Sequence, residues 1–171
     1  MMYKTHIIGG IFLYLLLALI FGIGKEFYLL LAVAIGTLLP DIDSSKSWIN
    51  NLFKPGKIVA AASKHRGFWH SIFGLLAIFL LTAFVFAALK ISAAMAFYVA
   101  FGALTHLLFD ALTVTGIKPL WRFSSFELRW KIKTNGILEY VLFFILLLSS
   151  IYLYSPQFVA NVTSYVIKLF K

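Results

Sequence analysis

The chain alternates between long apolar stretches and shorter polar connections. Apolar residues fill five segments, at 7–23, 27–39, 71–89, 93–113 and 137–154. Stretches of this kind are typical of membrane helices, which need about 20 residues to cross a bilayer at right angles. The pattern therefore predicts an all-α, polytopic membrane protein with about five spans. Residues 1–171 should form a single integral membrane domain, because the spans leave no room for a second one.

The connections between these segments differ greatly in length. A tight turn at 24–26 joins the first and second segments, and another at 90–92 joins the third and fourth. The connections at 40–70 and 114–136 are long. Segment 27–39 provides only about 20 Å of helix, so we expect a partial span supported by its neighbours. Residues 157–171 have the pattern of an amphipathic surface helix.

Composition excludes an ordinary soluble domain. Hydrophobic residues make up 62% of the chain, charged residues only 12%, and the mean hydropathy is +0.96. The chain has no cysteine, which rules out disulfides and thiolate metal sites. The first apolar segment lacks a small-x-small cleavage signal, so we interpret it as a retained span rather than a signal peptide.

The basic residues predict which side of the membrane each connection faces. With five spans, residues 1–6 and both long connections share one side, and the tight turns lie on the other. The tight turns hold only Lys25 and Lys90. Cytoplasmic loops are enriched in Lys and Arg, so the net charge of +9 points to anionic headgroups rather than nucleic acid. The long-connection side holds eleven cations: Lys4, Lys46, Lys54, Lys57, Lys64, Arg66, Lys118, Arg122, Arg129, Lys131 and Lys133.

The same topology gathers the titratable residues near the cytoplasmic surface. All four histidines and four of the six acids fall within about two helical turns of that side. Ionisable groups at this depth are costly, and they mark functional sites by default. The residues are His6, Asp41, Asp43, His65, His70, His106, Asp110 and Glu139.

Spacing suggests metal binding. His106 and Asp110 are four residues apart, so on a helix they project from one face about 6 Å apart along the axis. Such a pair can ligate one ion or two, or the carboxylate can orient the histidine. Asp41 and Asp43 would face one way if their turn is extended. Without thiolates, the set suits Zn²⁺ best, with Mn²⁺ or Fe²⁺ as alternatives and one to three ions.

Each of these residues alone has an ordinary explanation. His106 could be a hydrogen-bonded interhelical residue, and Asp110 could cap its helix or pair with a loop lysine. The Asp41 segment is a plausible turn, His6 an interfacial residue, and Arg66 a positive-inside anchor. Their joint placement on one side favours the metal interpretation.

Four stretches resemble the YdjM-like family of inner-membrane proteins: "GTLLPDID", "HRGFWHS", "GALTHLLFDALTVTG" and "NGILEY". Some members are under LexA control, and a more distant similarity is to zinc-dependent phospholipase C. The chain departs from the family pattern at Ser44, where a histidine is common, and at Trp69, where a threonine is common. The resemblance implies a membrane-bound, metal-dependent hydrolase. By motif, it implies metal or catalytic roles for His6, Asp41, His65, His70, His106, Asp110 and Glu139, with Asp43 the less certain of its pair.

We therefore expect an inner-membrane hydrolase that cleaves a phosphoester of a lipid or lipid-linked substrate at the cytoplasmic interface. Asp43 or Glu139 would act as general base, and Arg66 would neutralise charge on the phosphate. The main alternative is a metal-binding or ion-transporting protein without hydrolysis. A scaffold that recruits partners through its basic loops would explain the lysines but not the histidines. Oligomeric state and substrate identity are not set by the sequence.

Overall fold

The computed structural model is all-helical in the part of the chain that it describes, residues 1–45, 47–52, 56–62, 66–157, 159 and 163. The predicted all-α class is confirmed. The predicted tail helix, 157–171, lies almost wholly outside the described residues. The five long helices are α1 (Tyr3–Phe21), α2 (Phe27–Gly36), α5 (Ile72–Ala88), α6 (Met95–Ala111) and α7 (Ile137–Tyr154). The short elements are η1 (Leu39–Asp43), α3 (Trp48–Leu52), α4 (Gly56–Ala62) and η2 (Phe68–His70), where η marks a 3₁₀ turn.

Two helix ends differ from the predicted ranges in ways that matter for the site. Helix α1 begins at Tyr3 rather than residue 7, so His6 lies in its first turns. Helix α2 ends at Gly36 rather than residue 39. Pro40 has no N–H to donate to the Gly36 carbonyl, and the chain continues as the 3₁₀ turn η1.

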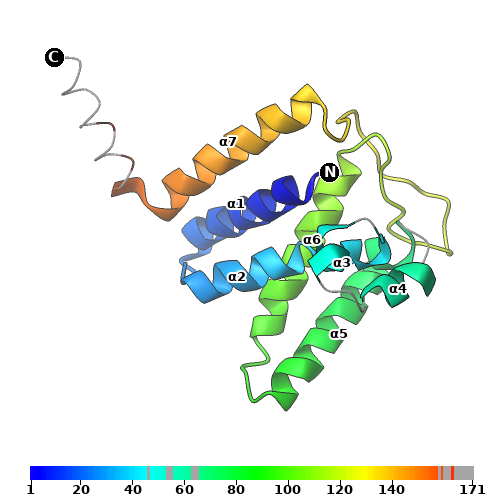
Figure 1. The fold of residues 1–171 in the computed structure, drawn as a ribbon. Coiled ribbons are helices and arrows are strands. Elements are labelled where there is room, and N and C mark those ends of the chain that lie inside the picture. Colours follow the sequence, from blue (N-terminus) through cyan, green and yellow to red (C-terminus); the bar gives the residue numbers. More distant parts are fainter. Residues whose placement is uncertain (46, 53–55, 63–65, 158, 160–162, 164–171) are drawn as a thin grey trace.

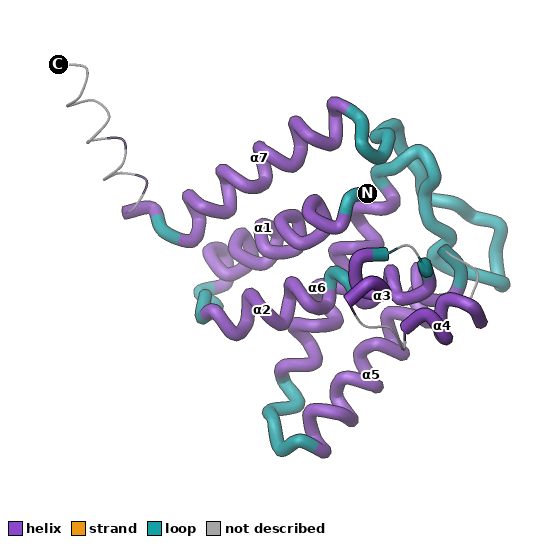
Figure 2. The backbone as a smooth tube through the Cα atoms, viewed as in Figure 1, coloured by secondary structure: helices purple, strands orange, loops and turns teal. Residues whose placement is uncertain are grey.

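Helix α6 is the centre of the bundle. It packs against α1, α2 and α5, and α1 in turn lies between α2 and α7. In Figure 1 the hairpins α1–α2 and α5–α6 diverge from the region that holds the N-terminus, α3 and α4. Figure 2 shows the long loop between α6 and α7 returning to that same region. The two long polar connections and the start of α1 therefore meet in one region at the same side of the bundle.

The contact between α2 and α6 depends on two glycines. A Cβ at Gly36 would overlap the Val99 carbonyl oxygen, and a Cβ at Gly102 would overlap that of Val33. Small residues of this kind let membrane helices approach backbone to backbone. This close approach fixes α6 against the end of α2, four residues before His106.

Replacing Gly102 with valine should force α6 away from α2. We expect a loss of about 2 kcal/mol in stability, and hence a fall of roughly 4–8 °C in the midpoint of thermal unfolding in detergent. Leu108→Val on the exposed face of the same helix is the matched control and should change the midpoint little. Equal midpoints for both variants would contradict this account of the packing.

Two helices of the described chain are long and apolar enough to cross a bilayer. They are α1, with 19 residues and a mean hydropathy of 1.9, and α7, with 18 residues and 2.1. Helices α5 and α6 have 17 residues each, and α2 has 10, or about 15 Å, half the thickness of a bilayer core. The five predicted segments are helices, but five spans are not confirmed.

Candidate metal centre

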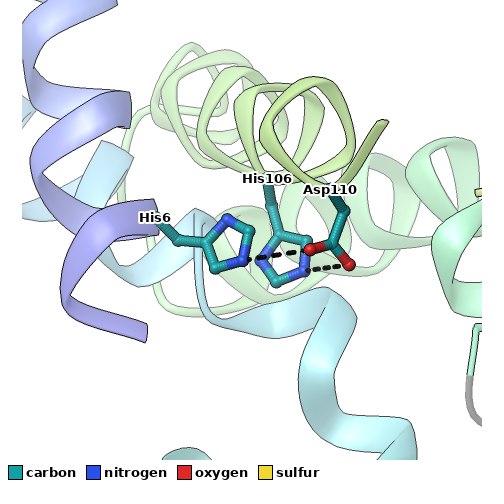
Figure 3. Close-up of side chains that lie close together, drawn as sticks. All are labelled: His6, His106 and Asp110. Carbon is teal, nitrogen blue, oxygen red and sulfur yellow. Dashed lines mark ion pairs between the residues drawn. The ribbon is translucent and has the colours of Figure 1, made fainter. Parts of the chain in front are cut away.

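Histidines and aspartates from four elements, most of them buried, meet at one end of the helix bundle, where the sequence predicted them to gather. His6 comes from α1, Asp41 from η1, and His70 from the end of η2, while His106 and Asp110 lie on α6. They form two overlapping groups whose ligand atoms lie within 4.8 Å of one another: His6, His106 and Asp110, and Asp41, His70 and His106. Either group could hold a metal ion. Figure 3 shows His6 and His106 side by side and directed toward Asp110.

His106 presents one nitrogen to the cluster in the form that binds metals. Its Nδ1 lies 2.6 Å from the Thr37 carbonyl oxygen, which can only accept a hydrogen bond, so Nδ1 carries the proton. In a neutral ring, Nε2 then has a lone pair. That nitrogen lies 3.7 Å from Asp110 Oδ2 and 3.8 Å from Asp41 Oδ1. A lone pair facing two carboxylates is unfavourable unless a cation lies among them.

His70 has a similar arrangement, with a carboxylate behind it. Its Nδ1 lies 3.1 Å from Oδ2 of Asp43, which also accepts the backbone N–H of Arg66 at 3.0 Å. The other nitrogen, Nε2, lies 3.6 Å from both Asp41 Oδ1 and Asp110 Oδ2. A carboxylate that fixes the tautomer of a ligating histidine is a common outer-shell feature of metal sites.

The charges around His70 favour a cation in this position. Burial disfavours the charged ring, but the neighbouring carboxylates of Asp41 and Asp43 outweigh it and raise the pKa of His70 to about 9. Burial also opposes ionisation of Asp41, yet the neighbouring His106 and His70 hold the pKa of that carboxyl below its usual range. A divalent ion would supply the positive charge that a proton supplies in its absence.

His6 completes the second group. Its ring stacks on His106 with centroids 3.7 Å apart and planes 9° apart, and its Nε2 lies 3.4 Å from Asp110 Oδ1. Within the described residues, neither nitrogen of His6 nor Nε2 of His106 has a hydrogen-bond partner, although the side chains are only 1% exposed. Buried polar atoms are rarely left without partners, because each one costs free energy.

The distances between these atoms match ligands of a shared ion better than hydrogen bonds. The five pairs lie 3.4–3.8 Å apart, beyond ordinary hydrogen-bond distances. Two ligands that each lie about 2.1 Å from one tetrahedral ion are about 3.4 Å apart. His106 offers one nitrogen and so serves one ion. Asp110 directs Oδ1 to His6 and Oδ2 to the other histidines, which would let it bridge two.

The aspartates of η1 have different positions. Asp41 and Asp43 would face one way only in an extended turn, and their segment is instead a 3₁₀ turn. With three residues per turn, side chains two positions apart diverge by about 120°. Asp41 therefore joins the cluster, with 22% of its side chain exposed, while Asp43 lies behind His70.

The structure places Glu139 outside both groups. It is fully buried in the first turn of α7, where Oε1 accepts the Met2 N–H at 2.6 Å and Oε2 accepts the Asn135 N–H at 2.8 Å. The carboxylate thus ties the turn before α7 to the start of α1. His65 lies outside the described residues, so its predicted role as a ligand stays a prediction.

Positive groups also contact Asp110. Arg66 Nη2 lies 3.0 Å from Oδ2, and the Met1 amine lies 2.8 Å from Oδ1. The same guanidinium donates through Nη1 to the Gly116 carbonyl at 2.8 Å and to the hydroxyls of Thr113 and Thr115. Arg66 therefore connects the cluster with the loop between α6 and α7.

Sequence reasoning missed the groups that orient the ligands. The Thr37 carbonyl fixes His106, and its signal was available: Pro40 ends α2, which leaves carbonyls of its last turn without helical partners. Thr113 and Thr115 gave no signal, because short polar residues after a helix usually belong to a turn.

Substitution of Asp43 by asparagine should weaken metal binding without removing a ligand. Asparagine keeps the shape of the side chain but cannot match a carboxylate in orienting His70, and changes of this kind cost about 10–100-fold in affinity. Zinc titration against a fluorescent chelator would measure the effect. Glu26→Gln, an exposed change at the far turn, is the control. Equal affinities for the two variants would exclude the positioning role of Asp43.

Comparison with known proteins gives matches along the whole chain. The profile of the YdjM inner membrane protein family matches residues 1–170. The uncharacterized protein YvsG of Bacillus subtilis is 34% identical over 160 residues, which covers 91% of this chain and 95% of YvsG. The inner membrane proteins YdjM of Escherichia coli and Shigella flexneri are 34% identical over 115 residues, 64% of this chain. The match spans about half of their own length, 55%. No solved structure matches the chain significantly.

Proposed function

Since the chain belongs to the family of YdjM inner membrane proteins, we propose that its buried cluster is the metal centre of a hydrolase acting on a phosphoester at the membrane surface. The predicted location in the inner membrane is confirmed by the family match, and the predicted family is confirmed with it. LexA control and the likeness to phospholipase C stay predictions. The observation that carries the proposal is the Nε2 lone pair of buried His106, which faces two carboxylates.

Zn²⁺ is the ion that we propose, because imidazole and carboxylate ligands suit it and no thiolate is available. Asp41, His70, His106 and Asp110 would hold one ion, and His6 with Oδ1 of Asp110 would serve a second. The chemistry that such an ion supplies is Lewis acidity and a water acidic enough to react near neutral pH.

The protein's own residues would prepare the site for that chemistry. The Thr37 carbonyl and Asp43 hold His106 and His70 in the required tautomers. Arg66 would neutralise charge on the phosphate, since guanidinium groups match phosphate oxygens. Asp43 and Glu139 were the expected bases, but both already accept hydrogen bonds, so we assign them positioning roles.

Hydrolysis can be tested with purified full-length protein and a panel of phospholipids. We expect release of phosphate or headgroup from at least one lipid, loss of turnover on incubation with a strong chelator, and recovery on addition of Zn²⁺. A zinc-loaded protein that turns over no lipid or soluble phosphoester would contradict the hydrolase proposal. It would favour the metal-binding or ion-transporting alternative.

The arrangement in the membrane is also a proposal: five spans, with the cluster facing the cytoplasm. Because the chain has no cysteine, single cysteines can report each side. Ser125→Cys, in the exposed loop after α6, should be protected from a membrane-impermeant maleimide in spheroplasts, whereas Ser92→Cys, in the α5–α6 turn, should be labelled. The reverse pattern would place the cluster on the outer side.

A further inference from the structure

We infer that the cavity beside Arg66 is a binding site for a phosphate group, an inference that rests on the proposed function and identifies where its substrate is held. The cavity has a volume of about 510 Å³ and lies between the residues before η2 and the loop that follows α6. Its lining includes Arg66, Gly116, Lys118, Trp121, Arg122 and Ser124. None of these residues belongs to the two groups of metal-binding side chains.

The cavity is polar and strongly positive. Arg66, Lys118 and Arg122 contribute three cations to its lining, against the single carboxylate of Glu127. Within the described chain, no ion pair joins Lys118 or Arg122 to an acid, so their charges are available to a ligand. Hydroxyl groups of Thr115, Ser124 and Ser125 add donors. Cations and hydroxyls together are the groups that recognise phosphate.

Arg66 places this cavity next to the metal centre. One guanidinium nitrogen contacts Asp110, the carboxylate that would bridge two ions, and the other binds the Gly116 carbonyl in the cavity wall. A phosphate held by Lys118 and Arg122 would therefore lie on the far side of the same guanidinium. Such an arrangement suits an anionic phosphoester. One part of the molecule would be held in the cavity while the phosphorus of the bond to be cleaved approaches the cluster.

Aromatic residues indicate that the cavity opens at the membrane surface. Phe123 and Phe126 lie on either side of Ser124 and Ser125, and they are 80% and 55% exposed. The Phe123 ring contacts Phe73, in the first turn of α5, at a centroid distance of 5.1 Å. Large apolar side chains that are exposed beside an apolar helix are suited to contact with lipid at the membrane surface. A volume of this size suits the headgroup of a lipid, and the acyl chains of that lipid would stay in the bilayer.

Two double variants test the site. Lys118→Gln/Arg122→Gln changes the cavity, and Lys131→Gln/Lys133→Gln is the control. Both double variants remove two cations from the same loop, but only the first pair lines the cavity. Full-length protein in a maltoside detergent, which contains no phosphate, is titrated calorimetrically with inorganic phosphate and with dihexanoyl phosphatidic acid. We expect the first variant to bind the preferred probe about tenfold more weakly than wild type, and the control to stay within about twofold.

The two probes separate the sources of the phosphate. Tighter binding of phosphatidic acid assigns the cavity to a lipid headgroup, and tighter or equal binding of inorganic phosphate assigns it to a soluble phosphoester; either result supports the site. Equal loss in both double variants, or binding of neither probe by wild type, would overturn it. Zinc content is measured on the same samples. Protein that binds phosphate but no zinc would refute the metal centre and leave this inference standing.

Discussion

His106→Ala is expected to lower the affinity for zinc at least about 100-fold and to abolish hydrolysis. His106 belongs to both groups of ligand atoms, and its only available nitrogen faces Asp41 and Asp110. Removing it leaves two carboxylates without the imidazole that completes the ligand set. Metal content after dialysis, measured by inductively coupled plasma mass spectrometry, is the direct assay.

Thr105→Val is the matched control for this variant. Thr105 is fully buried on the same helix, one residue earlier, and its hydroxyl donates to the Gly102 carbonyl of that helix. The control should retain its metal and most of its thermal stability. If a folded His106→Ala protein retained the zinc content of wild type, the ion would be bound elsewhere.

Arg66→Lys is expected to lower kcat about 10²–10³-fold while zinc content stays within about twofold of wild type. Lysine keeps the charge, but it cannot contact Asp110 and the Gly116 carbonyl at once as the guanidinium does. The backbone N–H that binds Asp43 is unchanged by the substitution. The loss should therefore appear in catalysis and not in metal binding.

Steady-state kinetics and metal analysis on one preparation separate these effects, with Lys131→Gln as a control for a cation outside the cavity. Undiminished kcat in Arg66→Lys would contradict the role of the guanidinium at the phosphate. Zinc loss in proportion to the loss of activity would instead make Arg66 a residue that supports the metal centre.

The sequence predicted the helices well because membrane helices are defined by long apolar stretches. It also predicted which polar residues would share one side, since His6 and His70 lie at the start of a helical segment and His106 lies near the end of one. Alternation of direction between helices was sufficient for that result. The spacing of His106 and Asp110 further predicted that both project from one face of α6, and the two side chains do face the same cluster.

Other features depend on contacts that sequence patterns do not contain. Asp41 and Asp43 have opposite roles because of a 3₁₀ turn, which a stretch of five residues does not specify. Glu139 was predicted to be a ligand because it lies as close to the predicted cytoplasmic side as the histidines do. Its carboxylate instead accepts the Met2 N–H, which the start of α1 brings to it. The basic cavity requires the loop after α6 to fold back, where Ile117 pairs with Leu128.

Anomalous diffraction at the zinc absorption edge, from crystals of the full-length protein grown with zinc, tests the central claim most directly. We predict a peak within about 2.3 Å of His106 Nε2, with His70 and Asp110 among the remaining ligands. An anomalous peak at another position, or none at saturating zinc, would contradict the assignment of this cluster as a metal centre.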